Sequence, residues 1–142
     1  MTCDASEMAL HHVGFVVADI ALAAPAFSRS LSAQWDGCVY EDPHQKVRVT
    51  FLSSRACDAR IELVEPVGED SPVWRFLKEK GGGLHHVCYE VADLEAGMLE
   101  MKSRGALIAR RPRSAIAFRG RRIAWMLTSE KLLVELLEKR AG

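Results

Sequence analysis

The sequence predicts an α+β fold in which one unit of strands and a helix occurs twice. The stretch LHHVGFVVAD at 10–19 returns as LHHVCYEVAD at 84–93, with seven of ten positions identical and an offset of 74 residues. A second pair of stretches, ELVE at 62–65 and ELLE at 135–138, has an offset of 73 residues. Because two separate pairs share nearly the same offset, we infer an internal repeat rather than two chance matches.

Each unit opens with a strand that leads into a helix. The first strand alternates between faces, so that one set of apolar side chains can pack against the helix that follows. Segments 20–33 and 94–106 are typical of helices. Asp19 and Asp93 stand immediately before them, where a carboxylate can accept hydrogen bonds from the first backbone N–H groups.

Further strands complete each unit. In the first unit they are predicted at 46–52, which alternates well, and at 59–66, which ends in a proline. In the second unit, 121–128 and 131–138 take the same places. Composition alone would also allow a short helix at 131–138, but its position in the repeat favours a strand.

The chain is therefore divided at the boundaries of the repeat. The segment between the units contains VWRFLKEK followed by three glycines, which predicts a short helix that ends at the glycines. The predicted divisions are a flexible N-terminus at 1–9, a first unit at 10–66, a helical linker at 67–83 and a second unit at 84–139. The two units are expected to form one domain together.

Composition and charge narrow the class of protein. No apolar run approaches the roughly 20 residues that span a bilayer, and the N-terminus lacks the features of a signal peptide, so we expect a cytoplasmic protein without membrane contact. The four cysteines form no CxxC pair. The net charge is zero, but residues 1–70 carry 5 basic and 11 acidic residues, whereas 71–142 carry 14 and 8.

Much of the positive charge lies between Arg110 and Arg122, in RRPRSAIAFRGRR. Such a segment can be a solvated surface, or it can bind nucleic acid or an anionic small molecule such as a phosphorylated cofactor. No nucleic-acid-binding motif accompanies it, so no nucleic-acid partner is expected.

Four residues at matching repeat positions form the candidate metal site. By strand alternation, His12 and His86 point away from the face that the helix covers. Glu62 and Glu135 lie in strands that otherwise consist of apolar residues, and burying an unpaired carboxylate is very costly. A divalent metal would satisfy two imidazoles and two carboxylates together.

The neighbouring polar residues have less specific interpretations. His11 and His85, the leading residue of each pair, are expected to be structural or to tune the site from behind the ligands. His44 and Gln45 precede a strand, and they are interpreted either as a polar turn or as hydrogen-bonding partners of a substrate.

The run IELVEPVGEDSPVWRFLKEKGGGLHHVCYEV at 61–91 resembles the vicinal oxygen chelate superfamily, and within it the methylmalonyl-CoA epimerase family. The resemblance implies two tandem βαβββ units that form a cupped, incomplete-barrel mixed sheet, the glyoxalase fold. It implies the metal ligands His12, Glu62, His86 and Glu135, which the repeat also selects. It also implies a homodimer.

The resemblance predicts the chemistry. We expect a metal-dependent epimerase or isomerase that moves the α-proton of an acyl-CoA thioester through a metal-stabilised enolate. Glu135 is the expected base, with Glu62 opposite, and the cofactor is a divalent ion such as Co, Mn, Ni or Zn. The arginine-rich segment would then suit the phosphates of coenzyme A.

Two departures from the family pattern bear on the substrate. LTSEK at 127–131 stands where many epimerases have HPK and glycines, and Val49 stands where some members carry a proposed glutamate base. Two alternatives therefore remain. One is a glyoxalase I-type lactoylglutathione lyase that acts on a thiol hemithioacetal, and the other is a non-catalytic protein that sequesters a ligand. A dioxygenase is disfavoured because its iron site uses two histidines and one carboxylate.

Overall fold

The computed structural model describes residues 7–140, and the chain forms two compact units. One unit is His12–His85, and the other runs from His86 onward together with the start of the chain up to His11. Residues 1–6 of the predicted flexible N-terminus lie outside the described part of the chain.

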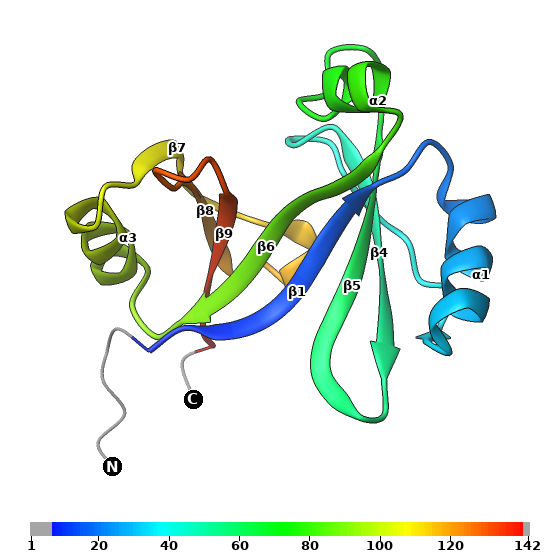
Figure 1. Ribbon diagram of the computed structural model, residues 1–142, viewed down its shortest axis with the longest axis horizontal. Helices are drawn as coiled ribbons and strands as arrows, with labels where there is room; N and C mark the ends of the chain where they lie inside the picture. Colours follow the sequence, from blue (N-terminus) through cyan, green and yellow to red (C-terminus); the bar gives the residue numbers. More distant parts are fainter. Residues whose placement is uncertain (1–6, 141–142) are drawn as a thin grey trace. The chain divides into compact units, whose positions relative to one another are not determined.

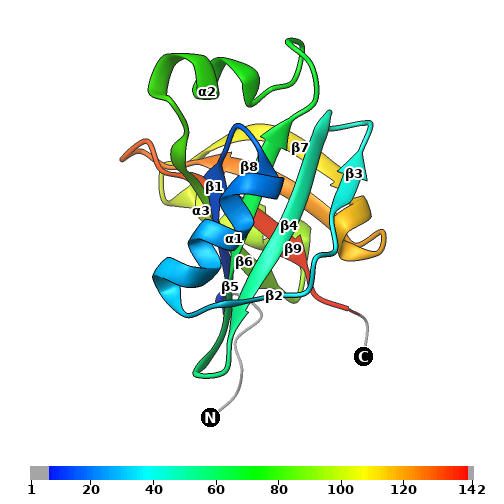
Figure 2. The same ribbon diagram turned by 90° about the vertical axis from the view of Figure 1, so that its right-hand side faces the viewer.

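The unit at 12–85 contains a mixed sheet and a helix that covers one of its faces. Its strands run in the order β2-β4-β5-β1, with β3 paired to β4 (Figure 2). β1 is parallel to β5, and the other pairs are antiparallel. The elements are β1 (Ala9–Val16), α1 (Ile20–Leu31), β2 (Gln34–Trp35), β3 (Tyr40–Asp42), β4 (Val47–Ser54), β5 (Cys57–Pro66) and α2 (Trp74–Lys80).

The second unit repeats this arrangement with the strand order β6-β9-β8-β7 (Figure 1). β6 is parallel to β9, as β1 is to β5. Its elements are β6 (Gly83–Val91), α3 (Leu94–Ser103), β7 (Leu107–Ser114), a 3₁₀ turn (Ile116–Phe118), β8 (Arg122–Leu127) and β9 (Leu133–Glu138). The predicted α+β class with two βαβββ units and an open mixed sheet is confirmed, and 131–138 contains a strand rather than a helix.

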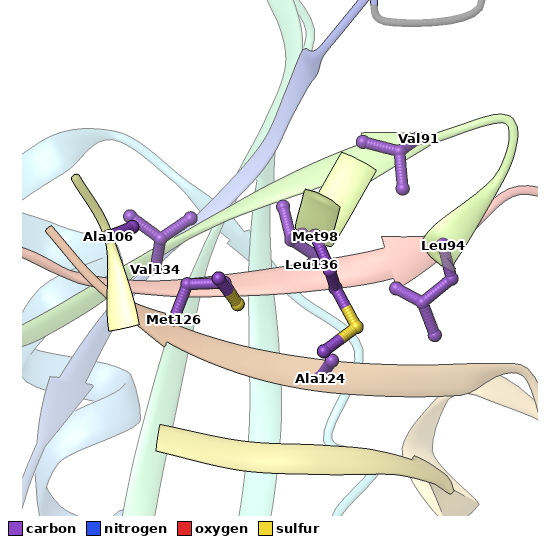
Figure 3. Packing of buried hydrophobic residues seen from close by; sticks show 8 residues of the cluster. All are labelled: Val91, Leu94, Met98, Ala106, Ala124, Met126, Val134 and Leu136. Carbon is purple, nitrogen blue, oxygen red and sulfur yellow. The ribbon is translucent and has the colours of Figure 1, made fainter. Parts of the chain in front are cut away.

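The hydrophobic core of the second unit lies between α3 and one face of its sheet (Figure 3). Val134 and Leu136 of β9 are buried there against residues of α3, and Leu136 has no exposed surface. Since alternate residues of a strand point to opposite faces, Glu135 between them is directed to the other face of the sheet. The other buried residues of this core are Val91, Leu94, Met98, Ala106, Ala124 and Met126.

The helix caps follow the sequence signals. The Asp19 carboxylate accepts a hydrogen bond from the Ala21 N–H at 2.9 Å, and the Asp93 carboxylate accepts one from the Ala96 N–H at 3.0 Å. The predicted linker helix ends at Gly81, whose positive φ of 74° suits a residue without a side chain.

The structure also contains strands that the sequence did not predict. β7 is not among the strands assigned from the sequence, yet it pairs with β8 along most of its length. Its side chains are almost all exposed, so it has no burial pattern to identify it. No helix in the described part of the chain is long and apolar enough to cross a membrane.

Candidate metal centre

The first half of the candidate site is the pair His12 and Glu62. β1 and β5 are parallel with Gly14 opposite Glu62, so His12, two residues before Gly14, shares a face with that carboxylate. The His12 Nε2 atom lies 3.5 Å from Glu62 Oε1. Both residues are buried, with exposed fractions of 0 and 5 %.

The second half repeats this geometry in the other unit. β6 and β9 are parallel with Cys88 opposite Glu135, and His86 stands two residues before Cys88. The His86 Nε2 atom lies 3.6 Å from Glu135 Oε1, and these residues are 4 and 3 % exposed. The structure thus pairs each predicted histidine with the glutamate of its own unit, in the same register.

An aromatic ring stands beside each pair, and sequence reasoning did not single it out. Phe51 is opposite Glu62 in the β4–β5 pair, and its ring centroid is 5.7 Å from that of His12. Trp125 is opposite Glu135 in the β8–β9 pair, with its centroid 4.8 Å from that of His86. Both contacts are edge-on and restrain the imidazole ring. The repeat could have identified these two aromatic residues, because each lies on the strand that comes just before the strand with the glutamate of its unit.

The leading histidines contact other rings. His11 lies edge-on to Phe118 at 5.5 Å between centroids, and His85 lies edge-on to Phe76 of α2 at 5.0 Å. These contacts support the structural interpretation of the leading residue in each HH pair.

The donor chemistry of each pair fits a divalent cation. Each pair offers one imidazole nitrogen and one carboxylate oxygen, a set that suits zinc, cobalt, nickel and manganese. The distances of 3.5 and 3.6 Å exceed a normal hydrogen bond. Two donors at roughly 2.1 Å from one ion are about 3.0–3.5 Å apart, so the observed spacing is close to that of two ligands of a common ion.

The chain also matches a known family. Residues 11–125 match the sequence model of the Glyoxalase/Bleomycin resistance protein/Dioxygenase superfamily. The chain belongs to this superfamily. Among its relatives, the ethylmalonyl-CoA/methylmalonyl-CoA epimerase of Cereibacter sphaeroides is 38% identical over 100 residues, which cover 70% of this chain and 72% of that protein. The mitochondrial methylmalonyl-CoA epimerase of Homo sapiens is 36% identical over 96 residues, 67% of this chain and 53% of that protein. The chain thus spans about half the length of the human relative.

Solved structures of the superfamily share the fold. The hypothetical protein BH1468 from Bacillus halodurans has a TM-score of 0.83 at 29% identity, over 96% of this chain and 97% of that one. Methylmalonyl-CoA epimerase from Mycobacterium tuberculosis has a TM-score of 0.81 at 27% identity, over 92% and 87%. The predicted resemblance to the superfamily and to its epimerases is confirmed, as is the expectation of an enzyme.

His44 and Gln45, the polar residues that the sequence singled out before a strand, have a structural partner in Asp42. Asp42 is buried and accepts hydrogen bonds from the backbone N–H groups of His44 and Gln45, each at 3.0 Å. The Gln45 side chain donates to the same carboxylate at 3.0 Å. These hydrogen bonds are those expected if His44 and Gln45 form a polar turn.

The basic segment is divided between paired and unpaired arginines. Arg121 binds Glu90 at 2.8 Å, and Arg122 makes two hydrogen bonds to Glu95 at 2.7 and 3.0 Å and one to Glu138 at 2.8 Å. Hydrogen bonding with Glu95 is the main cause that raises the pKa of Arg122, and hydrogen bonding from Arg122 lowers the pKa of Glu95. Arg110, Arg111 and Arg113 of β7 are exposed, and the described residues supply no ion-pair partner for them.

Proposed function

We propose that this chain is a metal-dependent epimerase that moves the α-proton of an acyl-CoA thioester. The observation that carries the proposal is the recurrence of one buried His–Glu pair in the same register of both units. Support comes from relatives named for the epimerisation of methylmalonyl-CoA, one of which is 38% identical.

In the proposed site, His12, Glu62, His86 and Glu135 bind one divalent ion together. A single pair supplies only two protein donors, whereas divalent transition-metal sites in enzymes use three or more. The second pair supplies the remaining donors. The ion, when bound, would stabilise the negative charge that develops on the thioester carbonyl oxygen as the α-proton leaves.

The two glutamates move the proton in this proposal. The Glu135 carboxylate takes the proton from the α-carbon, and Glu62 returns one from the opposite side. Val49, where some epimerases carry a proposed glutamate base, is buried and cannot accept a proton. Phe51 and Trp125 contact the imidazole rings of His12 and His86 edge-on, which restrains the two histidines beside the carboxylates.

The ion's identity and the assembly belong to the proposal as well. The nitrogen and oxygen donors suit Co, Mn, Ni or Zn, and a homodimer is proposed from the family resemblance. The relatives described above that carry a functional name are epimerases, which favours this activity over the lyase and over the ligand-sequestering protein.

The test is solvent exchange at the α-carbon. Metal-free protein is loaded with Co(II), incubated with methylmalonyl-CoA in D2O, and the mass gain of the substrate is followed. Glu135→Gln keeps an oxygen donor but loses the basic carboxylate, so we expect uptake per bound metal to fall by about 10²- to 10⁴-fold. Glu138→Gln, in the same strand, is the matched control and should exchange at the wild-type rate.

Either of two results would contradict the proposal. One is wild-type protein that binds one metal per chain and incorporates no deuterium. The other is Glu135→Gln protein that exchanges as fast as Glu138→Gln at equal metal content.

A further inference from the structure

A pocket of about 370 Å³ lies in the unit at 12–85. Two aromatic rings and one arginine are among the side chains around it, together with amide, hydroxyl and carboxylate groups. The lining residues are Gln34, Trp35, Asp36, Phe51, Ser53 and Arg60.

The pocket adjoins the first half of the metal centre. Phe51 lines the pocket and also contacts the His12 ring. Arg60 stands directly opposite His12 in the β1–β5 pair. Arg60 and Glu62 are two residues apart on β5, so their side chains leave the same face of the sheet. A ligand held at His12 and Glu62 would therefore have the guanidinium of Arg60 beside it.

The charge of Arg60 is available to a ligand. Five other arginines bind glutamates: Arg48, Arg75, Arg104, Arg121 and Arg122. For Arg60, no carboxylate of the described residues lies within ion-pair distance. The pocket's own acid, Asp36, accepts a hydrogen bond from the Cys38 N–H in its loop at 2.9 Å.

The fold itself does not require a cation at this position. Glu62 and Glu135 are equivalent at an offset of 73 residues, and the same offset places Leu133 at the position equivalent to Arg60. The second unit thus builds the same β-strand with an aliphatic residue. Arg60 is an asymmetric feature added to an otherwise duplicated site.

We propose that Arg60 binds the free carboxylate of the substrate and makes the enzyme selective for 2-carboxyacyl thioesters. This inference rests on the proposed function and names its substrate class. A guanidinium presents a planar fork of N–H donors that matches both oxygens of a carboxylate. Phe51 lines the same pocket, so the carboxylate would lie between the guanidinium and an apolar ring.

The test compares two ligands that differ by the carboxylate. Calorimetry gives the Kd of methylmalonyl-CoA and of propionyl-CoA for metal-loaded wild-type protein and for Arg60→Met. We expect Arg60→Met to weaken methylmalonyl-CoA binding by about 10- to 100-fold and propionyl-CoA binding by less than about threefold. Arg60→Lys should give an intermediate loss. Arg55→Met, which removes an exposed arginine from the β4–β5 turn, is the matched control and should behave as wild type.

The outcomes separate the carboxylate from the rest of the ligand. Equal weakening of both ligands by Arg60→Met would overturn the proposal, because it would show a contact with the coenzyme A portion. Unchanged binding of both ligands by folded Arg60→Met protein would overturn it too. The proposed epimerase can fail independently of this inference. If binding prefers methylmalonyl-CoA in a way that depends on Arg60, but the wild-type protein exchanges no α-proton, the epimerase proposal is refuted and carboxylate binding at Arg60 is supported.

Discussion

Metal binding should stabilise this protein against heat, and the two histidines of each HH pair should differ in their contribution. His12 and His86 point toward a buried carboxylate of their own unit, whereas His11 and His85 lie against Phe118 and Phe76. We therefore expect His12→Ala and His86→Ala to abolish most of the stabilisation by added Co(II). His11→Ala and His85→Ala should retain it.

The size of the effect follows from linkage. A ligand at 100 times its Kd stabilises the folded state by about 2.7 kcal/mol. For a chain of 142 residues, one kcal/mol moves Tm by roughly 3–4 °C, so the wild type should gain about 8–11 °C. Loss of one ligand that weakens binding about 100-fold leaves about 0.4 kcal/mol at the same metal concentration, or roughly 1–2 °C.

The assay is a pair of thermal melts for each variant, with chelator and with a fixed concentration of Co(II). The increment is taken within each variant, so a lower starting Tm from a lost ring contact does not affect the comparison. Equal metal-induced increments in His86→Ala and His85→Ala would refute the assignment of the second histidine as the ligand. The same holds for His12→Ala beside His11→Ala.

Two further predictions concern stability. Leu136→Ala removes a fully buried side chain from the core of the second unit and should cost about 2–5 kcal/mol in urea unfolding, whereas Leu107→Ala, 68% exposed in the wild type, should cost less than about 0.5 kcal/mol. Similar costs for both would contradict the packing. Arg122, which also binds Glu138, lowers the pKa of Glu95 in the folded state. The interaction between Arg122 and Glu95 therefore stabilises the folded protein above the unfolded-state pKa of Glu95, and this stabilisation is lost as pH falls through the folded-state pKa of Glu95. Arg122→Gln should flatten the decline in stability between roughly pH 5 and 3, and an unchanged slope in urea titrations would contradict this.

The repeat allowed the fold to be predicted from the sequence, and it selected the four candidate site residues. Two sequence matches at nearly equal offsets placed His12 with His86 and Glu62 with Glu135, and alternation then chose the second histidine of each pair. The structure places each histidine beside the carboxylate of its own unit. Helix starts were also predictable, because capping is a local interaction between a side chain and the next few N–H groups.

Features that depend on tertiary contacts were not predictable. β7 is an edge strand with both faces exposed, so its sequence lacks the alternation that burial imposes. The linker helix predicted over VWRFLKEK begins at Trp74, one residue after Val73. Backbone bonds that join Ser71 to Gly68 and Trp74 to Ser71 form turns ahead of it. The contacts of Phe51 and Trp125 with the histidines depend on the register of neighbouring strands, and that register is a property of the folded sheet.

Duplication suits the proposed reaction because an epimerase must reach both faces of one carbon atom. Two copies of a unit supply two equivalent carboxylates, Glu62 and Glu135, one for removal of the proton and one for its return. The proposed substrate is not symmetric, however, because it carries its free carboxylate on only one substituent. A duplicated site must therefore differ between its halves wherever it binds that group. The cation at Arg60 and the aliphatic residue at Leu133 are such a difference, at equivalent positions of strands that are otherwise built alike.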